Sequence, residues 1–267
     1  MSLEQLIILS IIQGITEFLP ISSSGHLVFI PGLLGWEDQG ILIDVAVHVG
    51  SLFAVLIYFW RDLLGLLGGA WDLVRGQISE QGRLVLLLIG ATVPIVIMGL
   101  VAHELGLIDY LRSVEVIGWT TLIFGLVLYA ADRADVTVHS MKEMTVRDAM
   151  IVGGAQVLSL VPGTSRSGIT MTAARFLGFQ RSEAARFSML LSIPTISSAG
   201  LLAVLELMDS GDAQLTNDAV AAAFLSFVSA LLAIWGLMSL VNRVGFLPFV
   251  IYRTILGLGL LIWVYAS

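Results

Sequence analysis

The amino-acid sequence predicts an all-α polytopic membrane protein, built as an inverted-topology repeat in which each half holds one re-entrant helical hairpin and three transmembrane helices. Three observations carry this prediction: the composition, six long apolar segments and a duplicated hydroxyl-rich motif. Of the 267 residues, 57% are hydrophobic and 12% are charged, whereas ordinary globular chains carry about 25% charged residues. The chain has no cysteine and no block of basic residues, which excludes disulfide bonds and argues against nucleic-acid binding.

Each half of the chain begins with an apolar segment that is interrupted near its centre. Residues 3–34 are broken at Pro20 and the serines that follow it, and residues 149–178 are broken at Pro162 and a second group of serines. Each arm is shorter than the ~20 residues that a membrane-crossing helix needs. Irregular backbone at membrane depth is tolerated where it is buried in protein or lines a cavity. We therefore expect two re-entrant hairpins.

Each hairpin is followed by three apolar segments that are long enough to cross a bilayer. These predicted transmembrane helices cover residues 43–60, 84–102, 114–131, 186–207, 219–241 and 248–265. We expect residues 63–76 to lie at the membrane interface instead. Because three is an odd number, the two halves enter the membrane in opposite orientations, as in many transporters.

The charges of the loops test this topology independently. Basic residues gather in loops that alternate onto one side, and the facing loops carry mostly acidic residues. By the positive-inside rule, the linker at residues 132–148, which contains Lys142, is cytoplasmic and both termini face outward. The chain then forms a single membrane domain, residues 1–267, with a first repeat at residues 1–131 and a second at residues 149–267.

Two arginines and one histidine of the predicted membrane segments need a separate interpretation. Arg175 and Arg253 fall just inside the cytoplasmic boundary, where we interpret them as snorkelling to the interface. His48 lies within the first span. It could line a cavity, but we interpret it as a hydrogen-bonded residue that packs between helices.

A duplicated motif carries the predicted chemistry. The first copy runs from Gln13 to His26 as QGITEFLPISSSGH, and the second begins at Gln156 as QVLSLVPGTSRSG. A shift of 143 positions superimposes Gln13 on Gln156, Ser22 on Ser165, Ser24 on Ser167 and Gly25 on Gly168. The first copy also carries Glu17, and the second carries Arg166. We predict that the two turns form two halves of one site.

The two serine turns are typical of an anion site. In each hairpin the second half-helix begins at the turn, where free backbone N–H groups and the helix dipole favour negative charge. The residues that we expect to surround an anion are Gln13, Ser22, Ser24, Gly25, Thr164, Ser165, Ser167 and Gly168. The alternative is that the serines are only helix caps, but their duplication favours a site.

Three ionisable residues of the motif are candidates for catalysis. Arg166 at membrane depth costs roughly 2.5–3.5 kcal/mol to insert, and its guanidinium matches phosphate oxygens bidentately. The alternative for Arg166 is a structural salt bridge with Glu17. Glu17 could act as a general base, orient His26 or hold a divalent cation. His26 directly follows the serine turn and could act as an acid, a base or a nucleophile.

Both motifs closely resemble those of the bacitracin-resistance type of undecaprenyl-diphosphate phosphatase, and the resemblance covers essentially the whole chain. It implies hydrolysis of undecaprenyl diphosphate to the monophosphate and inorganic phosphate, which recycles the lipid carrier of cell-wall synthesis. The implied site opens to the outer face of the cell membrane and uses Glu17, Ser23, His26 and Arg166. The family has Glu or Gln where this chain has Gln13, so a metal site that needs a carboxylate pair is weakened here.

We expect phosphoryl transfer in a cleft between the two turns, with the prenyl tail lying between helices towards lipid. Ser23 is the expected nucleophile, activated by His26 and Glu17, and His26 as the nucleophile is the alternative. A divalent cation, Mg²⁺ or Ca²⁺, would neutralise charge on the substrate. A lipid-phosphate transporter or flippase without hydrolysis is the competing function, because inverted repeats with broken helices also build transporters. The sequence leaves open the metal, the prenyl length and whether the chain forms a homo-oligomer.

Overall fold

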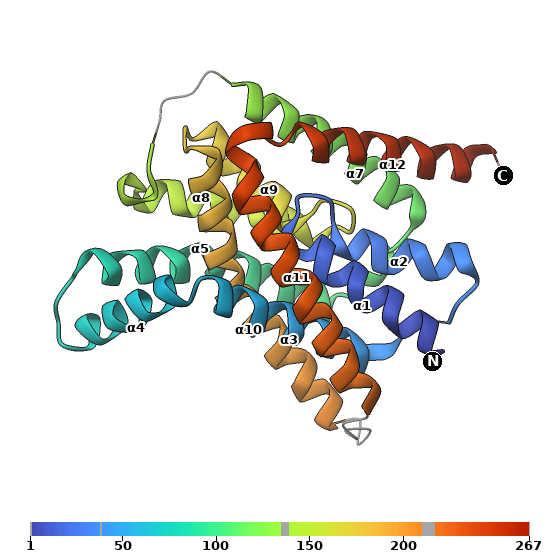
Figure 1. Ribbon diagram of the computed structural model, residues 1–267, viewed down its shortest axis with the longest axis horizontal. Helices are drawn as coiled ribbons and strands as arrows, with labels where there is room; N and C mark the ends of the chain where they lie inside the picture. The colour runs from blue at the N-terminus through green and yellow to red at the C-terminus, as the bar shows by residue number, and fades with distance from the viewer. Residues whose placement is uncertain (1, 38, 135–138, 210–216, 267) are drawn as a thin grey trace.

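The computed structural model describes residues 2–37, 39–134, 139–209 and 217–266, which fold into helices joined by short connections (Figure 1). Among these residues the backbone makes one isolated bridge, between His139 and Phe179, and no strand. The predicted all-α class is therefore confirmed for the described part of the chain. Residues 135–138 of the predicted linker lie outside it.

The helices follow the predicted order. The first half of the chain contains α1 (Leu3–Phe18), α2 (Ser23–Leu34), α3 (Gly40–Tyr58), α4 (Trp60–Val74), α5 (Glu80–Glu104), α6 (Leu107–Tyr110) and α7 (Val114–Arg133). The second half contains η1 (Met141–Glu143), α8 (Val146–Gln156), η2 (Val157–Leu160), α9 (Arg166–Phe176), α10 (Arg181–Asp209), α11 (Asn217–Val244) and α12 (Leu247–Ala266). Within the described residues, six helices are long and apolar enough to cross a membrane, namely α3, α5, α7, α10, α11 and α12. These match the six predicted spans.

Both interrupted segments form at the predicted places. The first breaks between α1 and α2, where Leu19 is extended with a ψ of 146°. Leu19 precedes Pro20, and a residue before proline is driven out of the helical region. The second break separates α8 and η2 from α9, on either side of Pro162. The paired half-helices are thus present.

Neighbouring helices pack closely through small residues, as is common in membranes. α11 packs against α1 and α3, and α12 packs against α7 along one edge of the molecule (Figure 1). At the α7–α12 contact, a Cβ added to Gly257 would lie 3.0 Å from the carbonyl oxygen of Gly118. A side chain larger than hydrogen would therefore push these two helices apart.

The core of the molecule surrounds the N-terminal half of α10. Phe187, Met189, Leu190 and Leu191 of this helix are fully buried. α10 contacts α3, α5 and α9, so it lies between the first transmembrane helices and the second serine turn. This position brings α10 against both halves of the predicted site.

Two arginines correct the sequence interpretation. Arg175 is buried; it donates to the carbonyl oxygen of Phe179 at 2.5 Å and lies 3.7 Å from a carboxylate oxygen of Asp132. Arg253 is also buried, and backbone carbonyls surround its guanidinium. Snorkelling is therefore wrong for both residues, because their guanidinium groups are buried and contact other groups of the protein.

Candidate active site

The two serine turns have the same unusual backbone. Ser22 has a φ of 74° and Ser165 a φ of 72°, and no other described residue besides glycine has a positive φ. Each side chain caps the helix that follows, accepting from the N–H of Gly25 at 3.3 Å and of Gly168 at 3.1 Å. Such conformations cost on the order of 1–3 kcal/mol each and cluster at functional sites. The serines are thus helix caps, held in a strained geometry.

Hydrogen bonds join the two turns directly. Ser167 Oγ of the second turn donates to the carbonyl oxygen of Leu19 in the first at 2.9 Å. Arg253 Nη1 on α12 donates to the carbonyl oxygens of both Pro20, at 3.2 Å, and Thr164, at 3.0 Å. Further bonds from its guanidinium reach the carbonyl oxygens of Gly163, Thr120 and Thr121. One buried side chain therefore fixes both turns to each other and to α7.

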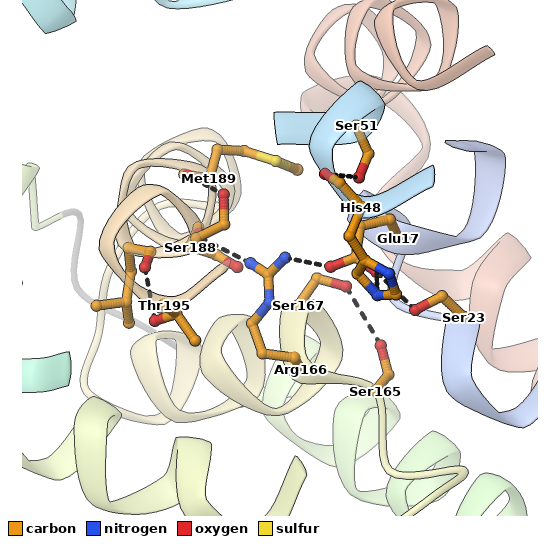
Figure 2. A network of polar contacts seen from close by, with 12 residues as sticks. Glu17, Ser23, His48, Ser51, Ser165, Arg166, Ser167, Ser188, Met189 and Thr195 are labelled. Atoms are coloured by element: carbon orange, nitrogen blue, oxygen red, sulfur yellow. Dashed lines mark hydrogen bonds and ion pairs between the residues drawn. The ribbon is translucent and has the colours of Figure 1, made fainter. Parts of the chain in front are cut away.

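Glu17 lies where the two turns meet (Figure 2). Its Oε1 accepts from Arg166 Nη2 at 2.7 Å, and its Oε2 accepts from Ser23 Oγ at 2.7 Å and from Gln13 Nε2 at 2.9 Å. The His48 Nε2 atom lies 3.9 Å from Oε2. The structure thus brings together four of the residues that the sequence assigned to the site: Gln13, Glu17, Ser23 and Arg166.

Arg166 makes the salt bridge that the sequence raised as the alternative to ligand binding. Besides Glu17, its guanidinium donates through Nη1 to the carbonyl oxygen of Ser188 at 3.3 Å and lies 5.7 Å from the ring centroid of Phe18. Arginine has five N–H donors, and these contacts use two of them. Because Arg166 also lines a cavity, it can pair with Glu17 and bind an anion at the same time.

A cavity of about 450 Å³, here called the Glu17 cavity, opens from this cluster. Its polar end contains Glu17, Ser23, Ser24, Ser165 and Arg166. From there it continues between α3 and α10 over apolar or small side chains, namely Ile41, Val45, Ile196, Ala199, Gly200 and Ala203. A hydroxyl, a carboxylate and a guanidinium at one end of an apolar cleft suit a ligand with an anionic head and a hydrocarbon tail.

Of the four predicted catalytic residues, His26 is the one that the structure does not bring into this cavity. It is buried, with Nδ1 2.6 Å from the carbonyl oxygen of Ser22 and Nε2 2.6 Å from Tyr252 Oη. Because a carbonyl can only accept, Nδ1 donates and Nε2 accepts from the tyrosine hydroxyl when the ring is neutral. Both ring nitrogens are thus engaged behind the first turn.

The other predicted anion-site residues form two groups. Ser24 and Ser165 line the Glu17 cavity, whereas Ser22, Gly25, Ser167 and Gly168 form the buried turns behind it. Thr164 is completely buried. Among the described residues its hydroxyl, like Gln13 Oε1, has no hydrogen-bond partner. A buried polar atom without a partner commonly marks a position where a water or a ligand binds.

α3 contributes site residues that the sequence did not assign. His48 and Asp44 line the Glu17 cavity one helical turn apart. The His48 ring donates through Nδ1 to the carbonyl oxygen of Asp44 at 2.7 Å, which leaves Nε2 on the side of Glu17. The interpretation of His48 as a packing residue is therefore wrong. A pattern in the sequence could have revealed this role: Asp44 and His48 form an i, i+4 pair of polar residues inside an apolar span. Such a pair indicates a polar surface along that helix.

The cluster was also tested as a cation site. Among the described residues, no group of three or more histidine, aspartate or glutamate side chains converges to hold a metal ion. Both carboxylate oxygens of Glu17 already accept hydrogen bonds. These residues do not form a cation cage by themselves.

Comparison with known proteins gives one consistent result. The family model described as Bacitracin resistance protein BacA matches residues 6–259. A protein of Jannaschia sp. named undecaprenyl-diphosphatase is 54% identical over 267 residues, which cover both chains completely. Proteins of the same name from Roseobacter denitrificans and Ruegeria pomeroyi are 52% and 53% identical, covering 100% and 98% of each chain.

Proposed function

We propose that this chain, which belongs to the bacitracin resistance protein BacA family, is a membrane phosphatase that hydrolyses undecaprenyl diphosphate to undecaprenyl phosphate and inorganic phosphate. The observation that carries the proposal is the set of contacts at Glu17, which holds Ser23 Oγ at 2.7 Å and Arg166 Nη2 at 2.7 Å in one cavity. The name shared by the relatives supports the substrate. A flippase would need the anion-binding groups, but not a hydroxyl hydrogen-bonded to a buried carboxylate.

In the first step, Ser23 Oγ attacks the terminal phosphorus and its proton passes to Glu17 Oε2. The bond between that phosphorus and the bridging oxygen breaks, undecaprenyl phosphate leaves, and Ser23 becomes a phosphoserine. Arg166 and the N–H groups at the starts of α2 and α9 stabilise the phosphoryl oxygens. Phosphoryl transfer depends mainly on such positioning and charge stabilisation, which the joined turns supply.

In the second step, water attacks the phosphoserine. Glu17, having released its first proton to the departing phosphate or to solvent, takes a proton from the water and returns it to Ser23 Oγ. Inorganic phosphate leaves, and both residues regain their starting states. A carboxylate that alternates between base and acid in this way needs a direct hydrogen bond to the nucleophile, which the Ser23–Glu17 contact supplies.

His26 has a supporting role in this proposal. With Nδ1 on the Ser22 carbonyl and Nε2 on Tyr252 Oη, the imidazole fixes the carbonyl of the strained residue that precedes Ser23. As a nucleophile, His26 would first have to break one of these contacts and reach the cavity. The geometry therefore favours Ser23 as the nucleophile.

The membrane arrangement is part of the proposal. Six apolar helices, two broken half-helix pairs and the loop charges support two inverted repeats, at residues 1–131 and 149–267, each beginning with a re-entrant hairpin. The Glu17 cavity runs towards Ile41 and Ala203, near helix ends that this topology turns to the outer face. We propose a multi-pass protein of the cell membrane whose site opens outward.

Cysteine labelling tests this topology, because the chain has no native cysteine. A cysteine at exposed Glu37 should react with a membrane-impermeant thiol reagent on intact cells. A cysteine at Lys142, which is 76% exposed, should react only after the cells are opened. Equal labelling of both positions on intact cells would rule out the inverted arrangement.

The activity is tested by counting the phosphate that purified protein in detergent releases from undecaprenyl diphosphate. The wild type should turn over and Ser23→Ala should not, whereas Ser24→Ala should keep a kcat close to that of the wild type even where its affinity for the substrate falls. Ser24 is the matched control because it lines the same cavity but makes no contact with Glu17 among the bonds described above. No release by the wild type, with or without Mg²⁺, would exclude the phosphatase function.

A further inference from the structure

A second cavity lies beside the Glu17 cavity, between α5 and α10. We call it the side cavity; its volume is about 310 Å³, and Gly99, Leu100, Leu160 and Leu202 are among its lining residues. It shares three lining residues with the Glu17 cavity, namely Thr195, Ala199 and Ala203. The two cavities are therefore neighbours across one face of α10.

The periodicity of α10 shows how they connect. Thr195, Ala199 and Ala203 are four residues apart and form one line along the helix. Ile196 and Gly200, on one side of this line, face only the Glu17 cavity, and Ser198 and Leu202, on the other side, face only the side cavity. Thr195 and Arg166 line the same cavity. A flexible chain bound at Arg166 can thus cross α10 over two alanines.

Apart from His103, the lining of the side cavity consists of apolar or small side chains and two hydroxyls, which suits a hydrocarbon chain. The hydroxyls of its wall turn back onto the helix, with Thr195 Oγ1 donating to the carbonyl oxygen of Leu191 at 2.8 Å and Ser198 Oγ to that of Thr195 at 2.8 Å. These side chains therefore present mainly their carbon atoms. The cavity is wide enough for a hydrocarbon chain because three of its lining residues are small, namely Gly99, Ala199 and Ala203.

A larger apolar groove elsewhere lacks this continuity. It lies between α1 and α11, with a volume of about 610 Å³, and Ile11, Leu19 and Leu232 are among its lining residues. None of its lining residues borders the Glu17 cavity. A tail in that groove could not belong to a head group at Ser23 without passing through packed protein.

We propose that the side cavity binds the first isoprene units of the substrate, which leave the Glu17 cavity over Ala199 and Ala203; this rests on the proposed function. Lipid tails are as apolar as the cavity wall, so moving the chain from bilayer to cavity gains little hydrophobic free energy. The cavity instead orients the chain, so that the diphosphate enters with its terminal phosphorus towards Ser23.

The kinetic test narrows the side cavity without touching the Glu17 cavity. Gly99→Phe should lower kcat/KM for undecaprenyl diphosphate by roughly tenfold, because it overfills the path of the chain. The kcat/KM for geranyl diphosphate should fall much less, because its short chain stays largely within the Glu17 cavity. Turnover of this substrate therefore also shows that the variant is folded. An equal loss for both substrates, or no loss for either, would contradict the proposal.

Two variants serve as controls. Gly99→Ala should behave like the wild type, because its Cβ would lie 3.8 Å from Leu160 Cδ2, an ordinary contact. Met98→Phe places the same ring on the neighbouring residue, which is 43% exposed and lines neither cavity. It should leave the turnover of both substrates unchanged.

A binding measurement separates this inference from the proposed hydrolysis. Undecaprenyl diphosphate should slow the reaction of a small maleimide with Gly99→Cys by several-fold but leave Met98→Cys unaffected, and inorganic diphosphate should protect neither. This result does not depend on turnover, so it holds even if the wild type releases no phosphate. Equal labelling of Gly99→Cys with and without the lipid would place the chain elsewhere.

Discussion

In the first turn, Ser22 is followed by Ser23, and in the second, Ser165 is followed by Arg166. The two capping serines have nearly identical φ angles, and each accepts from a glycine N–H three residues later. The residue after each cap, at the first position of its helix, contacts Glu17. The same turn conformation therefore positions a hydroxyl on one side of the Glu17 carboxylate and a guanidinium on the other.

The turns differ in what supports them. Glu17, one helical turn after Gln13, has Leu160 as its counterpart in the second copy, so the duplicated motif supplies a single carboxylate. Arg253 bonds one carbonyl of the first turn, Pro20, and two of the second. A duplicated scaffold can thus provide symmetric positions, while single substitutions place a hydroxyl and a carboxylate on one turn and a guanidinium on the other. Each prediction below perturbs one side of this division.

The largest effect is expected from Ser23→Ala. Removing a nucleophile typically lowers kcat by about 10⁴–10⁶-fold, while the affinity for undecaprenyl diphosphate should change little because Arg166 and the backbone N–H groups remain. Phosphate release and equilibrium binding of the lipid measure the two quantities. Near-normal kcat would show that the first turn does not supply the nucleophile.

The second-largest effect is expected from Arg166→Lys, which should lower kcat by about 10²–10³-fold. Lysine keeps the positive charge beside Glu17 but loses the planar fork that matches phosphate oxygens. We expect KM to change less than kcat, because the fork serves the geometry of the transferring phosphoryl group. If Arg166 had only a structural role, Arg166→Lys would instead lower the thermal stability, and the enzyme that remained folded would keep its kcat.

Arg253→Lys tests the support that both turns share. An ammonium has three donors, so it cannot replace all five bonds of the guanidinium to backbone carbonyls. Each lost bond to a charged group costs about 1.5–3 kcal/mol, and we expect lower Tm in detergent together with roughly tenfold lower kcat from the displaced turns. Unchanged Tm and kcat would mean that the turns are held by other contacts.

Tyr252→Phe should have the smallest effect. It removes the hydroxyl that hydrogen-bonds His26 Nε2, a loss of about 1 kcal/mol in stability, and leaves the Glu17 cavity intact. We expect kcat within about threefold of the wild type. A fall of a hundredfold would instead assign catalytic proton transfer to His26, and the first turn would then supply two reacting groups.

The helices and their interruptions could be predicted from the sequence, because hydropathy and proline act locally. The six spans match the predicted segments to within a few residues at most ends, and Pro20 and Pro162 mark the two breaks. The 143-residue shift also predicted that Glu17 and Arg166 meet, although they are far apart in the chain, since two similar turns imply a shared site.

Side-chain direction required the tertiary structure. The sequence favoured His26 for the site and His48 for helix packing, whereas His48 lines the Glu17 cavity and His26 lies behind the first turn. Which face of α2 or α3 meets the cavity depends on how the other helices pack in the folded chain. Arg253 likewise was predicted to be an interfacial residue. In the structure, α12 packs against α7, and Arg253 donates to five backbone carbonyls. The sequence by itself determined which groups and which half-helices this protein has, since these depend on local composition. Only the tertiary structure decided which groups face one another, because long-range helix packing selects one face of each helix.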